Sequence, residues 1–80
     1  MGRYMVLNTH APEQCEPMEA DVDKIPPELK GQDFYCTCPG GEHAYYMFIE
    51  GDTSEQVLGL YPPSLKLGHT RAIPVESWHL

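Results

Sequence analysis

Two segments of this chain carry apolar side chains on both faces of an extended strand, which restricts their position in any fold. Residues 3–9 (RYMVLNT) and 44–50 (AYYMFIE) are apolar at odd and even positions alike. A strand with this pattern is buried on both sides, as the inner strands of a covered sheet are. We therefore predict that both segments are central strands of one sheet.

Two further segments have the features of edge strands. Residues 33–38 contain aromatic and β-branched side chains, and a Pro-Gly-Gly turn of hairpin length follows them at 39–41. Residues 69–78 form the last predicted strand, which contains Pro74. Because proline cannot donate a hydrogen bond to a central ladder, this strand is expected at an edge.

Two helices are expected between the strands. Within residues 13–29 the apolar residues recur at intervals of three and four, which describes one stripe along a helix, although Pro26 and Pro27 interrupt it. Residues 52–60 begin with the capping-box pairs Asp52-x-x-Glu55 and Thr53-x-x-Gln56. Both segments are therefore predicted to be helices that cover the sheet.

The order β-α-β-β-α-β predicts an α+β ferredoxin-like sandwich, with a four-stranded antiparallel sheet in the order 4-1-3-2. The 80 residues are expected to form a single domain, residues 1–80. Two helices cover one sheet face, and little chain is left to cover the other. We predict that a second copy covers it, giving a homodimer of the dimeric α/β-barrel type. The alternative is an apolar face that binds a different protein.

The charge balance excludes several classes of partner. Twelve acidic and five basic residues give a net charge of −7, and the basic residues are scattered along the chain. No basic stripe exists to bind a phosphate backbone or an anionic membrane, so neither nucleic acid nor a membrane is an expected partner. We expect no signal peptide or membrane span, and three cysteines without a disulfide framework favour the cytoplasm.

The segment from Cys36 to His43 (CTCPGGEH) combines two thiols, a tight turn and an imidazole. Thiolate and imidazole are the usual protein ligands of transition metals. The predicted topology places the ends of strands one and two and the starts of strands three and four at one rim. The candidate metal ligands at that rim are Cys38, His43, His10 and His69, on the loops 9–14, 38–43 and 66–69. This ligand chemistry favours zinc, nickel or copper over magnesium or calcium.

The remaining cysteines have structural interpretations. Cys15 belongs to the apolar stripe of the first helix and is expected in the helix core, although that helix begins near the rim. Cys36 is expected to be a small buried residue on a sheet face, since free cysteine is among the most buried residue types. Cys38 and His43 also fit an ordinary hairpin, and His10 and His69 fit ordinary loops, so the metal site is a hypothesis.

Three longer patterns resemble the small, single-domain proteins of the dimeric α/β-barrel superfamily. They are RYMVLNTHAPEQ at the first strand, YYMFIEGDTSEQVLG at the third strand and second helix, and TRAIPVESW at the last strand. The resemblance implies the ferredoxin-like fold and dimerisation. Members of that superfamily include a nickel-responsive group, haem-handling proteins, and cofactor-independent monooxygenases and isomerases. CTCPGGEH matches no catalytic set among them, so the resemblance assigns no catalytic residue.

Three functions follow from these observations. The first is a non-enzymatic protein that binds a transition metal or small ligand at the rim. The second is a small cofactor-independent enzyme resembling an oxygenase or isomerase, with Tyr45 or Tyr46 and a rim histidine as acid–base groups in the barrel cavity. The third is an interaction protein that uses the open sheet face. The sequence shows neither paired carboxylates nor a base–nucleophile spacing, so binding is favoured over catalysis.

Overall fold

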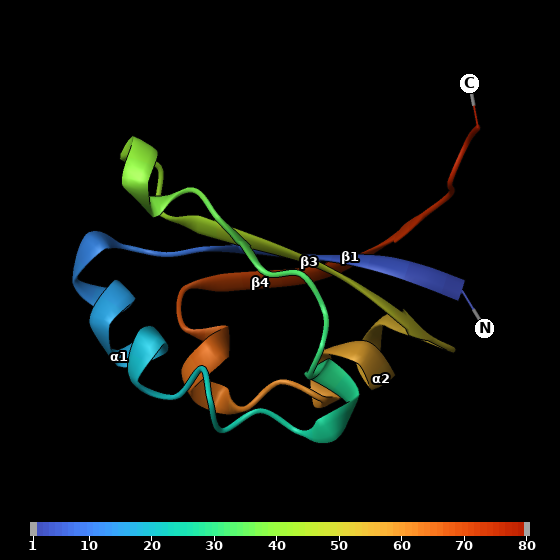
Figure 1. Ribbon diagram of the computed structural model, residues 1–80, viewed down its shortest axis with the longest axis horizontal. Coiled ribbons are helices and arrows are strands. Elements are labelled where there is room, and N and C mark those ends of the chain that lie inside the picture. Colours follow the sequence, from blue (N-terminus) through green and yellow to red (C-terminus); the bar gives the residue numbers. More distant parts are fainter. Residues whose placement is uncertain (1, 80) are drawn as a thin grey trace.

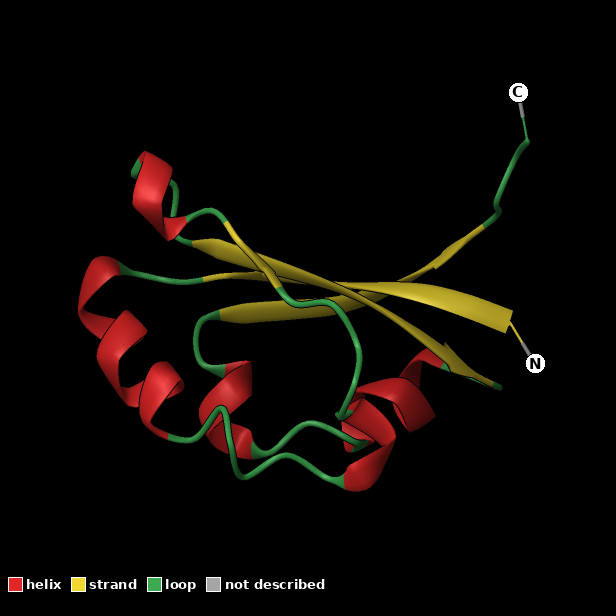
Figure 2. Ribbon diagram, in the orientation of Figure 1, coloured by secondary structure: helices red, strands yellow, loops and turns green. Residues whose placement is uncertain are grey.

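The computed structural model describes residues 2–79, which form one four-stranded antiparallel sheet with both α-helices packed on one side (Figures 1 and 2). The strands are β1 (Gly2–Thr9), β2 (Tyr35–Cys36), β3 (Ala44–Gly51) and β4 (His69–Val75). The α-helices are α1 (Cys15–Ala20) and α2 (Ser54–Gly59). Four 3-10 segments are η1 (Pro12–Gln14), η2 (Pro27–Leu29), η3 (Cys38–Gly40) and η4 (Pro63–Lys66).

The strands lie in the order β2-β3-β1-β4, which is the expected order 4-1-3-2 counted from the other edge. The two segments that are apolar on both faces, β1 and β3, are the central strands, as predicted. Pro74 lies in the edge strand β4 opposite Tyr4. The α+β class and the antiparallel four-stranded sheet are therefore confirmed.

The core lies between the sheet and the helical segments. Alternate residues of the central strands point into it, and they include Val6 in β1 and Tyr45 and Met47 in β3, which are at most 3% exposed. The helical side contributes Met18, Leu29, Val57, Tyr61 and Leu65. The buried hydroxyl of Tyr45 donates to the carbonyl oxygen of Leu65, and that of Tyr61 lies 3.3 Å from the sulfur of Met47.

The prediction of one helix over residues 13–29 is wrong. Only Cys15–Ala20 is α-helical, and the backbone N–H groups of Asp21 and Val22 then bond three residues back, which tightens and ends the helix. Aspartate is a weak helix former, and Pro26 and Pro27 supply no N–H donor, so the helix does not resume. A 3-10 turn instead buries Leu29.

The boundaries of the other helix and of the strands differ less from the predicted ones. Strand β2 has only two residues, because Cys38 belongs to the turn η3, and β4 ends at Val75 rather than at Trp78. Of the two predicted capping pairs, Thr53 and Gln56 cap α2: the Thr53 hydroxyl accepts from the Gln56 N–H at 3.1 Å, and the Gln56 side chain accepts from the N–H of Asp52, not of Thr53, at 2.6 Å. Of the Pro-Gly-Gly turn, only Gly41 adopts a positive φ, of 89°.

The opposite face of the sheet is apolar at its centre, and Arg3, Glu50 and Arg71 share this face around the apolar residues. Met5 pairs with Phe48 on one side and with Ile73 on the other, and Leu7 pairs with Tyr46, so these half-buried side chains share that face. In Figure 1, α1, α2 and the neighbouring 3-10 turns all lie on the other side of the sheet. Within residues 2–79 there is no helix with the length and apolar character needed to cross a membrane.

Candidate metal centre

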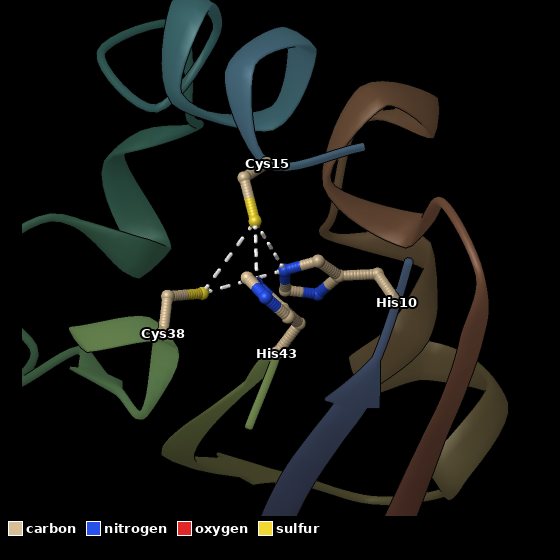
Figure 3. A group of neighbouring side chains, drawn as sticks. All are labelled: His10, Cys15, Cys38 and His43. Carbon is tan, nitrogen blue, oxygen red and sulfur yellow. Dashed lines mark hydrogen bonds between the residues drawn. The ribbon is translucent and has the colours of Figure 1, made fainter. Parts of the chain in front are cut away.

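Two imidazoles and two thiols converge at the rim of the sheet where β1 ends and β3 begins (Figure 3). The residues are His10, Cys15, Cys38 and His43, and one ligand atom from each lies within 4.8 Å of all the others. His10 follows β1, Cys15 begins α1, Cys38 begins η3, and His43 precedes β3. All four side chains are half-buried, so the cluster lies near the surface.

Three distances between donor atoms of the cluster lie close to those of a tetrahedral site. Zinc–sulfur bonds of about 2.3 Å and zinc–nitrogen bonds of about 2.05 Å give tetrahedral edges of roughly 3.8 Å between sulfurs and roughly 3.6 Å between sulfur and nitrogen. The Sγ atoms of Cys15 and Cys38 lie 3.7 Å apart. Nε2 of His10 lies 3.3 Å from the Cys15 sulfur and 3.5 Å from the Cys38 sulfur. Nδ1 of His43 lies 3.0 Å from the Cys15 sulfur, somewhat inside the ideal edge.

The sheet ladder positions the two histidines. The backbone N–H of His10 donates to the carbonyl oxygen of His43 at 2.9 Å, which continues the β1–β3 pairing beyond Thr9 and Ala44. Directly opposed residues share one face, and this pair follows the helix-facing pair Asn8 and Tyr45 by two positions. The two rings therefore lie on the helix-facing side, 5.9 Å apart between centroids.

A close approach of the loop before β4 also fixes His10. Gly68 has a φ of 78°, and a Cβ built there would clash with the carbonyl oxygen of Thr9 and lie 2.9 Å from the Cα of His10. Only glycine fits this contact, since any other residue would clash with the backbone that carries the imidazole.

The two thiols are presented by short capped turns. The side-chain oxygen of Gln14 accepts from the Ala11 N–H at 2.8 Å, while the Gln14 N–H donates to the Ala11 carbonyl at 2.9 Å, so the chain turns sharply into α1 at Cys15. In the hairpin, the N–H of Gly41 donates to the carbonyl of Cys38 at 2.9 Å. The Thr37 hydroxyl bonds to the carbonyl of Glu42 across the same turn.

Asn8 contacts the ring nitrogen of His10 that faces away from the thiols. It is fully buried, and its side-chain N–H₂ donates to the Leu67 carbonyl and to the Thr70 hydroxyl, both at 2.7 Å. Its Oδ1 atom lies 2.7 Å from Nδ1 of His10. Since the carbonyl of Leu67 requires a donor, the oxygen of Asn8 must face the imidazole and accept its Nδ1–H. The Nε2 lone pair of His10 is then directed at the thiols, as a metal ligand requires.

The charge state of His10 favours metal binding at neutral pH. Burial, together with the neighbouring His43, lowers the pKa of His10 below its ordinary value. A lowered pKa keeps the imidazole neutral, which is the form that binds metals.

The structure brings together three of the four ligands proposed from the sequence, His10, Cys38 and His43. His69 lies at the same rim, but it pairs with Thr9 and is exposed, outside the group of four. Its place is taken by Cys15, so the expectation that Cys15 lies in the helix core is wrong. Cys36 is exposed rather than buried, which is a second correction.

The two tyrosines considered for acid–base chemistry lie in different places. Tyr45 is buried, and its hydroxyl already donates to Leu65. Burial raises the pKa of Tyr45 far above its ordinary value, so the phenol stays protonated near neutral pH. Tyr46 belongs to the opposite sheet face, where it pairs with Leu7. Neither geometry provides a proton-transfer group in contact with the cluster.

The cluster is an S2N2 group of soft and borderline ligands, which is the donor set of a zinc-type centre. Comparison of this chain with protein-family models, with curated proteins and with solved structures finds no match.

Proposed function

We propose that this protein binds one transition metal ion through His10, Cys15, Cys38 and His43, and that zinc is the ion that fits best. The observation that carries the proposal is the set of donor distances, above all the 3.7 Å between the two sulfurs, which matches a tetrahedral edge. A tetrahedral S2N2 site favours zinc over ions that prefer square-planar or octahedral geometry.

Four protein ligands complete the shell of a tetrahedral ion, which is characteristic of structural rather than catalytic zinc. The ligands come from the end of β1, the start of α1 and the two sides of the hairpin turn. A bound ion would therefore join the start of α1 to the end of β1 and the hairpin, which are already paired with each other through the His10 N–H and the His43 carbonyl, and its binding energy would stabilise the fold. The function is thus metal binding in a small protein, without a catalytic step.

Elemental analysis and native mass spectrometry of protein purified without a tag or chelator test the proposal. We expect about one zinc ion per chain and its loss in a Cys38→Ser, His43→Ala double variant. The matched control is Cys36→Ser, His69→Ala, which removes the same residue types from positions outside the group of four. A protein that holds no zinc, nickel or copper, and takes up none on titration, contradicts the proposal.

We further propose that the functional unit is a homodimer with the ferredoxin-like sandwich packed sheet to sheet, as in dimeric α/β barrels. Support comes from the centre of the outer sheet face, where Met5 of β1 is the neighbour of Phe48 of β3 and of Ile73 of β4. In Figure 1, α1 and α2 both lie on the other side of these strands. Apolar side chains gathered on one face favour burial against a second copy. Three free thiols fit a reducing compartment such as the cytoplasm.

A further inference from the structure

An apolar pocket of about 270 Å³ lies between α1, the strand β3 and the segment before β2. Its floor consists of the buried side chains of Met18, Tyr45 and Leu65. Val22 and Phe34 line its outer part. The pocket lies on the helix-facing side of the sheet, away from the face proposed for dimerisation.

The outer part of this pocket is unusually apolar for a surface. Val22 and Phe34 are each 41% exposed, although both are large hydrophobic side chains. Exposed apolar groups that line one hollow mark a place where a ligand can remove them from water. The ring of Phe34 lies 4.8 Å from the ring of Tyr45 at an angle of 31°, so two tilted aromatic side chains pack together at one wall of the pocket.

The size and charge of the pocket restrict what it can hold. A dry apolar cavity of about 150 Å³ accommodates benzene, so a pocket of about 270 Å³ has room for one ring or two fused rings. Glu19 contributes a carboxylate, and none of the described lining residues is a lysine or arginine. An anionic ligand would lose its hydration there without gaining a cationic partner, which is costly.

Three members of the metal cluster also form part of this pocket. His10, Cys15 and Cys38 line it, so their side chains face both the proposed ion and the hollow. An ion would hold these three side chains in one arrangement and fix the shape of that wall. The pocket is formed by protein side chains alone.

The geometry points to a binding site for a molecule of one or two fused aromatic rings without negative charge, with the metal centre as one of its walls. The ring lies against Phe34 and Tyr45 and covers Val22. The role of the metal as a wall rests on the proposed function, whereas the aromatic site does not. Because metal and ring share a wall, each tightens the binding of the other by the same factor.

Indole is a suitable probe, and the methionine methyl groups are suitable reporters. Met18 lies in the pocket and Met5 lies on the opposite sheet face, so NMR of ¹³C-methyl-methionine protein contains its own control. For a ligand of this size we expect a saturable shift of the Met18 methyl with a dissociation constant of about 0.1–5 mM. Indole-3-carboxylate should bind at least about tenfold more weakly, because its charge is unpaired in the pocket.

Two matched variants distinguish binding in the pocket from nonspecific effects of an added tryptophan. Val22→Trp fills the pocket and should abolish the saturable shift, while Ala20→Trp adds the same side chain at an exposed position of α1 outside the pocket lining and should leave it unchanged. A shift that does not saturate overturns the aromatic site, as do equal shifts of Met5 and Met18 or undiminished binding to Val22→Trp.

The same titration with and without zinc tests whether the metal centre forms one wall of the pocket. We expect indole to bind the zinc-loaded protein at least about threefold more tightly. Equal affinity in protein shown to contain zinc overturns the role of the metal as a wall. If the protein takes up no metal, the proposed function fails, and the metal-free titration still decides whether the aromatic site exists.

Discussion

Asn8 holds Nδ1 of His10 at 2.7 Å while its own N–H₂ group bonds to the carbonyl of Leu67 and the hydroxyl of Thr70. One buried amide therefore connects the metal centre to the loop before β4 and to β4 itself. Such supporting hydrogen bonds fix the tautomer and orientation of a ligating histidine and raise its basicity. They also make a polar side chain tolerable in the core, since each of its donors and acceptors is satisfied.

Replacement of Asn8 by alanine should lower zinc affinity by about 10–100-fold, because the His10 ring loses the partner that orients it. Competition with a chromophoric chelator measures the affinity. Thr70→Val is the matched control: it removes one partner of the Asn8 N–H₂ group but leaves the contact with His10 in place. Its zinc affinity should stay within about threefold of the wild type. Equal losses in both variants would contradict an orienting role for Asn8.

Replacement of Gly68 by alanine should disturb the site through the backbone. The added Cβ meets Thr9 and His10, in addition to the cost of a left-handed conformation. Gly31→Ala is the control, because Gly31 has a φ of 83° but no atom within 4 Å of the added group. Gly31→Ala should reduce unfolding free energy by about 1–2 kcal/mol. Gly68→Ala should cost more and should alone weaken zinc binding; chemical denaturation and chelator competition measure these effects.

The sequence was sufficient to predict the sheet because burial on both faces leaves a strand few places to lie. Strands β1 and β3 are apolar on both faces, so they must be the central pair. Pro74 excludes β4 from the centre, and the tight hairpin turn places β2 beside β3, which leaves β4 beside β1. The prediction of one long helix over residues 13–29 was wrong for a different reason. An apolar stripe describes which side chains can share a face, but it does not show that the backbone between them is helical. Leu29 reaches the core through a 3-10 turn instead.

The site prediction missed Cys15 and included His69, and both outcomes have a geometric cause. Side chains on a helix lean toward its N-terminus, so the thiol of Cys15, the first residue of α1, points past the helix end to the rim. His69 pairs with Thr9, whereas His10 is one residue further and lies on the other face. Strand parity could have separated these two histidines. The contribution of Asn8 requires side-chain geometry that no sequence pattern contains.

The stability of the metal-free protein should fall on acidification below about pH 6.5, the ordinary pKa of histidine. Burial and His43 lower the pKa of His10 in the folded state, so the unfolded chain binds the proton more readily. The contribution is complete above the unfolded pKa and is lost as the pH falls through the folded one. Denaturation at a series of pH values should show this loss in wild type and in His69→Ala, but less of it in His10→Ala. An equal loss in His10→Ala would contradict the assignment.

The dimer predicts a mass of about 18 kDa in solution, twice the 9.0 kDa of one chain. Met5→Glu places a charge between Phe48 and Ile73 at the centre of the outer sheet face and should give a monomer, because the charge cannot be buried. Val22→Glu makes the same kind of change on the other side of the molecule and should stay dimeric. Size-exclusion chromatography with light scattering measures the masses. A wild-type monomer at micromolar concentration would contradict the dimer.

The three cysteines should differ in reactivity once zinc is bound. Cys36 is exposed and lies outside the group of four, whereas the thiols of Cys15 and Cys38 would be coordinated. Coordination engages one lone pair of each sulfur and makes it less nucleophilic, so iodoacetamide should alkylate Cys15 and Cys38 slowly while zinc is bound. Partial burial and the neighbouring Cys38 raise the pKa of Cys36, so this thiol should react more slowly than a free cysteine but should not depend on zinc. Removal of zinc by a chelator should then accelerate alkylation of Cys15 and Cys38 by about tenfold or more, with little change at Cys36. Peptide mass spectrometry over a time course resolves the three sites. If the chelator left the rates at Cys15 and Cys38 unchanged in protein that had contained zinc, the ion would have to lie elsewhere.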